Sequence, residues 1–200
     1  MSMLLRRRMM QNAVVNWHDI YQQVEYLESS GTQYITTEII PKILSNADSF
    51  YVDFSILTNN TVLVFGVRDT GFQLPSVTGY HLRADMVTGG TTKFFGYTSN
   101  GEKCSFKIEN QAATCLGVSY EGAYFNYNNP LTLFGKGNEV STLLIGRIYY
   151  CSYTYNNVKQ AELFPCYRKA DNKPGMYDTV NGIFYTNEGT SEFIIPTIGG

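Results

Sequence analysis

The sequence predicts an all-β protein built as an antiparallel sandwich. Its 200 residues include 16 Tyr, 12 Phe and 18 Gly, whereas only 16% of the residues are charged. Aromatic residues favour half-buried strands, and glycine supplies turns and bulges. A helix bundle would contain more Glu, Lys, Leu and Ala, and a disordered chain would carry more charge. The length suits one ordinary domain with a hydrophobic core.

Hydrophobic periodicity locates the strands. Apolar and polar residues alternate over Phe50–Ile56, which is typical of a strand buried on one face. The nearly continuous apolar run Thr61–Val67 predicts a strand covered on both faces. This pattern of short strands indicates a sandwich or a barrel. Further strands are expected at 24–27, 80–85, 94–97, 104–108, 114–118, 123–127, 131–134, 143–150, 162–166, 183–185 and 192–195.

Turn residues separate the predicted strands. Asn100-Gly101 and Asn181-Gly182 predict tight hairpins, because both central residues of a type I′ turn need a positive φ. Asn59-Asn60, Gly89-Gly90 and Asn128–Pro130 mark further turns. With no linker or internal repeat between them, the strands are expected to belong to one domain.

The N-terminus differs in character from the rest. Residues 1–15 are expected to form a basic and apolar arm, and residues 16–200 the jelly-roll sandwich discussed below. Met3–Leu5 precedes Arg6–Arg8, whereas a secretory signal places its charges first, so we expect synthesis in a cytoplasm without a signal peptide. Asn16–Gln22 is expected to form one or two helical turns capped by Asn16.

Charge, hydropathy and cysteine spacing narrow the function classes. The formal net charge of −2 argues against a nucleic-acid binder that neutralises phosphates, and no apolar run is long enough to span a membrane. The four cysteines, Cys104, Cys115, Cys151 and Cys166, include no C-x-x-C pair for zinc. We expect them to be reduced apolar fillers, with a Cys104–Cys115 disulfide as the main alternative.

Two segments of the chain resemble a known family. The first is Glu25–Thr37, with the sequence EYLESSGTQYITT, and the second runs from Gly146–Tyr149 through Glu162–Lys169 to Gly175–Phe193. In this order they resemble the laminin-G-like, concanavalin A-like jelly-roll domain proteins of gut bacteriophages and gut bacteria. The basic leader Met3–Met10 is similar to the one that precedes this domain in phage structural proteins. The resemblance reaches from residue 24 to residue 195 and is weakest in the middle.

The resemblance implies two stacked antiparallel sheets and a role in a virion. In that role the protein would be a head-fibre, decoration or tail-associated component, made in the host cytoplasm and incorporated into the virion. Its partners would be other capsid or tail proteins and copies of itself, with a trimer as one candidate. The alternative is a carbohydrate-binding adhesin or lectin-like module of a gut bacterium or phage, with a host-surface glycan as its ligand.

The arm is expected to anchor the sandwich to another virion protein. Its apolar side chains would dock into that protein, and its arginines would pair with carboxylates. Contact with packaged nucleic acid and a frayed terminus are the alternatives, but a purely electrostatic arm would not need the apolar flanks. The anchoring residues predicted in this way are Leu4, Leu5, Arg6, Arg7, Arg8, Met9 and Met10.

Residues of the two family segments also have expected structural roles. Ser29–Gly31 is expected to turn between the first two strands, and Pro165 to lie at a strand end or edge because it lacks an N–H. Gly175 would allow a tight bend, and Asp178 would accept N–H bonds in the following turn. These residues are interpreted as fold-making rather than catalytic.

No residue pattern predicts an enzyme, a metal or a cofactor. Sandwich hydrolases need two carboxylates around the sugar bond, and a Glu-x-Asp-x-x-Glu triplet does not occur in the sequence. His81 lies on the polar side of its strand and is interpreted as a surface residue. The carboxylates Asp69, Asp85 and Asp178 are too scattered to predict calcium.

Aromatic residues beside amide side chains predict sugar binding, because rings stack on pyranose faces and amides bond hydroxyls. Ordinary sheet tyrosines or a protein–protein interface would have the same composition. The richest glycan-binding candidate is Tyr120, Tyr124, Asn126, Tyr127 and Asn128. A second one is Tyr153, Tyr155, Asn156 and Asn157.

Overall fold

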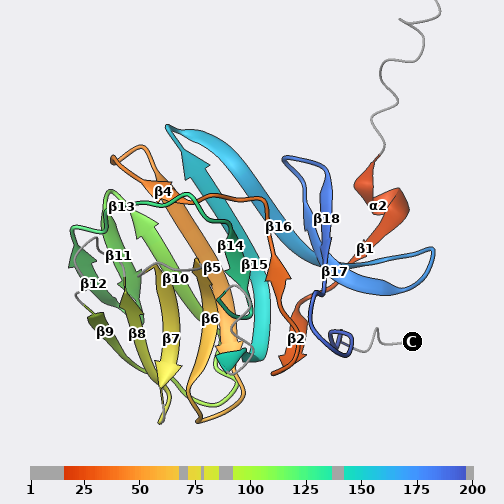
Figure 1. The fold of residues 1–200 in the computed structure, drawn as a ribbon, viewed down its shortest axis with the longest axis horizontal. Coiled ribbons are helices and arrows are strands. Elements are labelled where there is room, and N and C mark those ends of the chain that lie inside the picture. The colour runs from red at the N-terminus through yellow and green to blue at the C-terminus, as the bar shows by residue number, and fades with distance from the viewer. Residues whose placement is uncertain (1–15, 68–71, 78, 86–91, 137–141, 197–200) are drawn as a thin grey trace, which may run out of the picture.

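The computed structural model describes residues 16–67, 72–77, 79–85, 92–136 and 142–196. They form antiparallel β-sheets packed as a sandwich, preceded by a single helical turn, α2 (Trp17–Ile20) (Figure 1). The prediction of an all-β, antiparallel, jelly-roll-like sandwich is confirmed.

The larger sheet has ten strands. At its centre lie β5 (Ser49–Ile56) and the two longest strands, β15 (Ile145–Tyr155) and β16 (Val158–Arg168). Strand β1 (Tyr21–Gln23) pairs with β16, and β2 (Leu27–Ser30) pairs with β15. Apart from β1 and β2, the order of the strands across the sheet is β12 (Val118–Glu121), β11 (Ala112–Cys115), β10 (Cys104–Glu109), β5, β15, β16, β17 (Lys173–Asp178) and β18 (Ile183–Thr186).

A six-stranded sheet packs against the larger one. A separate pair, β4 (Lys42–Ile43) and β13 (Phe125–Asn126), lies at one end of the sandwich (Figure 1). The order of the six strands is β3 (Ile35–Thr36), β14 (Leu131–Leu133), β6 (Val62–Val67), β7 (Gln73–Val77), β8 (His81–Asp85) and β9 (Thr92–Tyr97).

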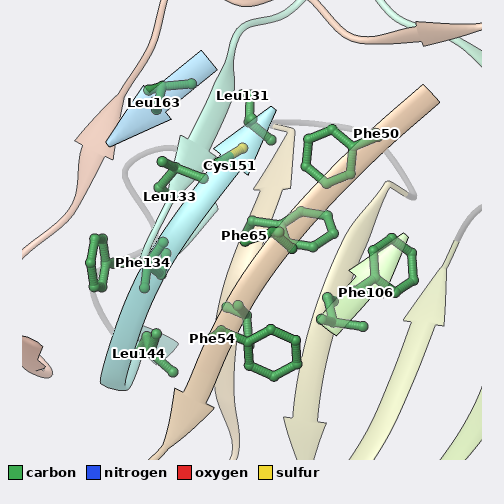
Figure 2. Packing of buried hydrophobic residues seen from close by; sticks show 14 of the residues in the cluster. Phe50, Phe54, Phe65, Phe106, Leu131, Leu133, Phe134, Leu144, Cys151 and Leu163 are labelled. Carbon is green, nitrogen blue, oxygen red and sulfur yellow. The ribbon is translucent and has the colours of Figure 1, made fainter. Parts of the chain in front are cut away.

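Side chains from the two facing sheets fill the interior. The Phe50 ring of β5 lies 5.0 Å from that of Phe65 in β6 and 6.5 Å from that of Phe106 in β10, between centroids. Figure 2 shows these rings beside Phe54 and Leu133, and none of the five is more than 1% exposed. Fully burying one such side chain contributes roughly 1.5–3 kcal/mol, so this cluster is a main source of stability.

Strands β5 and β6 have the burial patterns that their sequences predict. In β5 alternate residues face the core, whereas all six residues of β6 are buried. On the outer side of β6, Lys136, which follows β14, lies over Gly66. Leu143 makes a β-bridge with Leu63, and a Cβ placed on Gly66 would lie 2.8 Å from Cβ of Lys136.

The tightest turns do not fall on the two Asn-Gly pairs. Asn100-Gly101 lies between β9 and β10, where the chain passes from one sheet to the other. Asn181-Gly182 does join β17 to β18, but there, as at Asn100-Gly101, only the glycine has a positive φ. Among the described residues, paired positive φ values, which a type I′ turn requires, occur instead at Gly79-Tyr80, Asn110-Gln111, Leu116-Gly117 and Asn156-Asn157.

Several predicted strand boundaries are wrong. The segment 114–118 is not one strand, because the turn at Leu116-Gly117 divides it between β11 and β12. The segment 24–27 is mostly a link between β1 and β2. The predicted strand 192–195 is reduced to an isolated bridge between Ile194 and Glu28.

The start of the described chain follows the prediction. Trp17–Ile20 forms one helical turn, and Asn16 Oδ1 accepts a hydrogen bond from the N–H of His18 at 3.2 Å. This is the capping interaction that satisfies a free N–H at a helix start.

Pro165 and Gly175 lie inside strands, so the predicted tight bend at Gly175 is wrong, and Pro165 is not at a strand end but at a local edge with a ladder partner on one side only. Pro165 is tolerated because β16 changes partner there: its pairing with β15 ends at Leu163, and its pairing with β1 begins at Cys166. Gly175 is needed for close approach instead, because a Cβ there would lie 2.3 Å from the carbonyl oxygen of Tyr185.

The four cysteines are free and buried, as the sequence predicts. In the β10–β11 hairpin Cys115 lies opposite Phe106 rather than Cys104. Burial raises the pKa of the Cys115 and Cys166 thiols to about 12, which keeps them protonated and unreactive at neutral pH.

The two segments that carry the family resemblance pack on each other. Strand β2 pairs with β15, and Nε of Arg147 donates to Oε2 of Glu28 at 2.7 Å. Nε2 of Gln33 donates to the carbonyl of Glu192 at 3.1 Å, and its Oε1 accepts from the N–H of Ser30 at 2.9 Å. These bonds fix strands and turns, in line with the fold-making interpretation.

Candidate functional site

The structure separates the residues of the first predicted glycan patch. The Tyr120 hydroxyl donates to the carbonyl of Phe94 at 2.6 Å, and its ring lies 5.3 Å from that of Phe95. This tyrosine therefore connects β12, at the edge of the larger sheet, with β9, at the edge of the smaller sheet. Tyr127 is half-buried, and its ring stacks on that of Phe125 at 5.5 Å.

The other three members of this patch remain exposed. Tyr124 is 46% exposed, and Asn126 and Asn128 also face solvent. Asn126 belongs to β13, directly opposite Lys42 of β4. The patch predicted from the sequence is thus reduced to one open ring with two amides.

The second predicted patch is mostly structural. Tyr153 is only 4% exposed, and its hydroxyl donates to the carbonyl of Lys42 at 3.0 Å. Asn156-Asn157 forms the β15–β16 turn, in which the N–H of Asn156 donates to Oδ1 of Asp48 at 2.7 Å. The predicted anchoring residues Leu4–Met10 lie outside the described residues.

The outer face of the ten-stranded sheet gathers a larger set of aromatic side chains. Alternation along each strand places them on the side away from the core. Each ring contacts the next, with centroids 4.7–6.2 Å apart. We call this set the ring row, and its members in order are Tyr51, Tyr150, Phe164, Trp17, Tyr177, Tyr21 and Phe184.

The ring row crosses most of the larger sheet. Apart from Trp17 of α2 and Tyr21 of β1, its members come from β5, β15, β16, β17 and β18, which are consecutive neighbours. At about 4.8 Å between strands, these five strands extend over about 19 Å. All seven rings are half-buried, so each keeps part of its surface in solvent.

A β-bulge places two successive tyrosines on this face. The register of β15 against β5 shifts between Ile148 and Tyr150, and both Tyr149 and Tyr150 are half-exposed. Tyr149 lies beside the row rather than in it. Its hydroxyl is 3.3 Å from Oγ of Ser55, and Nζ of Lys103 lies 4.5 Å from its ring centroid.

One end of the ring row carries a chain of hydrogen bonds. The Tyr51 hydroxyl donates to Oγ of Ser105 at 3.0 Å, and Ser105 donates to Oδ1 of Asp53 at 2.5 Å. Nζ of Lys103 lies 3.6 Å from the other carboxylate oxygen. Burial raises the pKa of Tyr51, which keeps the phenol protonated as a donor.

The middle of the ring row is built around a fixed carboxylate. The Tyr150 hydroxyl donates to Oε1 of Glu162 at 2.8 Å, and the Thr179 hydroxyl donates to Oε2 at 3.2 Å. A hydrogen bond from Lys159 lowers the pKa of Glu162, and this outweighs the opposing effect of burial. Glu162 is therefore ionised at neutral pH and held in one position.

This arrangement suits recognition of a polyhydroxylated chain. The rings offer apolar surface, while Asp53, Ser105 and Glu162 hold hydrogen-bonding groups in place beside them. Among the residues that the structure describes, no three His, Cys, Asp or Glu side chains gather as a metal site would need. No helix in the described part of the chain is long and apolar enough to cross a bilayer.

Sequence reasoning missed the ring row for a clear reason. The alternation over Phe50–Ile56 already places Tyr51 and Asp53 on the solvent side of one strand. Their partners Tyr150 and Glu162 come from β15 and β16, and pairing between distant strands is not visible in one sequence. Each predicted patch consists of residues that lie close together in the chain.

Neither a protein-family model nor a curated protein matches this sequence.

Proposed function

We propose that this chain is a surface-attachment protein that binds glycan chains along the ring row. The observation that supports it is the continuity of the row across five neighbouring strands, with Glu162 and Asp53 fixed beside the rings. Aromatic faces can stack on the apolar faces of sugar rings, while the polar groups bond hydroxyls. An extended oligosaccharide fits such a row better than a single sugar does.

A glycan array of bacterial surface polysaccharides tests this proposal. Wild-type protein should bind at least one of them, and Tyr150→Ala should weaken that binding about tenfold, since one stacked ring contributes about 1 kcal/mol or somewhat more. Tyr97→Ala is the matched control, because Tyr97 is 66% exposed on the other sheet. It should bind as wild type does.

Three results would contradict the proposal. One is no binding to any glycan, and another is unchanged binding by Tyr150→Ala whose near-ultraviolet circular dichroism matches wild type. The third is loss of binding in Tyr124→Ala with none in Tyr150→Ala. That outcome would place the site at the exposed remainder of the predicted patch, Tyr124, Asn126 and Asn128.

We also propose that attachment takes place on a bacteriophage virion, as a head-fibre, decoration or tail-associated component. The resemblance of Glu25–Thr37 and Gly146–Phe193 to phage jelly-roll proteins supports this, and the pairing of β2 with β15 joins the two segments. Trp17, stacked on Tyr177 at 5.0 Å, fixes the start of the sandwich beside β17 and β18 (Figure 1). The arm at 1–15 would attach the sandwich to capsid or tail proteins.

Deletion of residues 1–12 tests the virion proposal. The truncated protein should fold, with the circular dichroism of wild type, but fail to enter particles. Full incorporation of the truncated protein would exclude anchoring by the arm. Mass measurement of the intact protein in solution tests the expected homo-oligomer.

A further inference from the structure

A second candidate site lies on the other side of β18 from the ring row. It is a cleft of about 250 Å³ between the link 37–41 and strands β16 and β18. Ile183 and Tyr185 line it, and they alternate along β18 with Phe184 of the ring row. The polar lining comes from Glu38, Gln160 and Asn181.

A β-bulge accounts for Gln160 in the cleft. In the register of β15 against β16, Gln160 is the extra residue between Lys159 and Ala161. Such a residue leaves the regular alternation, and its side chain can be redirected. Nε2 of Gln160 donates to the carbonyl of Val158 at 3.2 Å. That bond uses one of the two hydrogens on the amide nitrogen, so Gln160 offers its amide oxygen and one hydrogen to a ligand.

Asn181 is oriented by a buried carboxylate. Its Nδ2 donates to Oδ2 of Asp178 and to the carbonyl of Gln160, both at 2.7 Å. Asp178 also accepts from the N–H of Val180 at 3.0 Å, as the sequence predicts for this turn. The two bonds from Nδ2 use both hydrogens of the Asn181 amide nitrogen. Oδ1 of Asn181 is therefore the second acceptor left for a ligand.

Glu38 and Tyr185 complete the polar lining. The Tyr185 hydroxyl accepts from the backbone N–H of Glu38 at 3.3 Å, so its own hydrogen can still be donated. The Glu38 side chain is exposed. The cleft thus combines two amide oxygens and one carboxylate with only two donors, the Tyr185 hydroxyl and one amide hydrogen of Gln160.

We propose that this cleft binds a small ligand that carries a protonated primary amine. An ammonium group has three donors and no acceptor, which matches a lining rich in acceptors. Sugar hydroxyls both donate and accept, and this lining would satisfy few of their acceptor sites. Ile40, Ile183 and the Tyr185 ring offer apolar contact for the carbon body of the ligand. The volume, near the lower end of the roughly 300–1,000 Å³ typical of ligand sites, suits a molecule of one sugar's size.

Calorimetric titration of the full chain with four probes tests the proposal. Glucosamine carries the ammonium on a sugar ring, and cadaverine carries it on an aliphatic chain. N-acetylglucosamine and glucose keep the ring without the charge. At least one amine should bind tenfold or more tightly than both neutral sugars, and the tighter amine identifies the source. If neither amine binds more tightly than the neutral sugars, or if neither amine binds, the proposal is overturned.

Matched variants locate the binding. Glu38→Gln should weaken amine binding about threefold to tenfold while leaving the backbone N–H that holds Tyr185. Gln160→Met, which removes the amide oxygen, should act in the same direction. Glu121→Gln removes an exposed carboxylate at the far edge of the same sheet and should bind like wild type. Equal losses in Glu38→Gln and Glu121→Gln would show a non-specific charge effect and exclude the site.

The cleft and the ring row can be tested separately. Tyr150→Ala should leave amine binding unchanged, because Tyr150 faces the outer side of β15 and does not line the cleft. Glu38→Gln should leave polysaccharide binding unchanged for the same reason. Failure of one proposal therefore leaves the result for the other intact.

Discussion

The two outer faces of the sandwich present different surfaces although both are antiparallel sheets. The ten-stranded sheet carries the ring row together with the hydrogen-bonded carboxylates Asp53 and Glu162. On the six-stranded sheet β6 is fully buried, and the open part holds a small cluster on β8 and β9. In that cluster the rings of His81, Phe94 and Tyr97 lie 4.1–5.5 Å apart.

The path of the chain causes this difference. Of the described residues after β14, Lys136 lies over Gly66 on the outer side of β6, and Leu143 pairs with Leu63 of the same strand. The described segment that packs on the ten-stranded face is α2, and its Trp17 extends the ring row instead of hiding it. The open face is therefore the better candidate for a large ligand, and the following variants examine each face in turn.

Gly175→Ala should give the largest loss of stability. The new Cβ would lie 2.3 Å from the carbonyl oxygen of Tyr185 and 2.7 Å from the Phe184 ring. A neighbouring strand cannot retreat without breaking its ladder, so we expect a loss of about 3 kcal/mol in the free energy of unfolding. Chemical denaturation measures it, and a loss below about 1 kcal/mol would mean that β17 and β18 are loosely paired.

Gly66→Ala is the matched change on the other sheet. Its Cβ would lie 2.8 Å from Cβ and Cγ of Lys136. Lys136 lies outside the strand ladders and can shift, so the expected loss in the same denaturation experiment is about 1–2 kcal/mol. A loss equal to that of Gly175→Ala would show that Lys136 is held over β6 as rigidly as a strand ladder.

Tyr150→Phe and Tyr97→Phe compare single hydroxyls on the two faces. The Tyr150 hydroxyl donates to the half-buried Glu162, so its removal should cost about 1 kcal/mol. Tyr97 is largely exposed, and the loss of its hydroxyl should change the free energy of unfolding by less than about 0.5 kcal/mol. Thermal unfolding distinguishes the two, and equal effects would remove the argument that the ring row is held by fixed polar contacts.

Local patterns predict the fold better than its connections. The alternation of apolar and polar residues in β5 and the apolar run of β6 predict the burial of both strands correctly. This works because successive residues of a strand point to opposite faces of the sheet, so the pattern can be found in a short stretch of sequence. The Asn-Gly signal fails at Asn100-Gly101, where the chain changes sheets. Leu116-Gly117 is a tight turn without the expected asparagine, because the flanking pairing of β11 with β12 forces a positive φ on Leu116.

The candidate sites could be predicted only in fragments. Tyr51 and Asp53 lie two apart in one strand and face the same side, as their spacing requires. The bulge that redirects Gln160 and the strand order that brings Glu162 to Tyr150 depend on pairing across the sheet. Tyr120 shows the reverse case. Its sequence context suggests a ring open to a ligand, but its hydroxyl is bonded to the carbonyl of Phe94 in β9.

The pH dependence of Glu162 should give the smallest effect. Its pKa in the folded protein is lowered from 4.5, chiefly by the hydrogen bond from Lys159, so the folded state favours the ionised form. That stabilisation is fully present above pH 4.5 and is lost as the pH falls through the lower folded pKa. Because Glu162 is partly exposed, the expected size is a few tenths of a kcal/mol.

Urea denaturation of wild type and Glu162→Gln at pH 7 and pH 3 measures this contribution. The variant should be slightly less stable at pH 7, and the difference should shrink at pH 3, because that pH is well below 4.5 and closer to the lowered pKa of the folded protein. Glu121→Gln controls for the loss of one charge. If Glu162→Gln is as stable as wild type at pH 7, then Lys159 and Tyr150 do not hold the carboxylate in solution. The Glu162 carboxylate beside the ring row would then change position in solution instead of being held in one place. The ten-stranded face would in that case differ from the other face mainly in its aromatic rings.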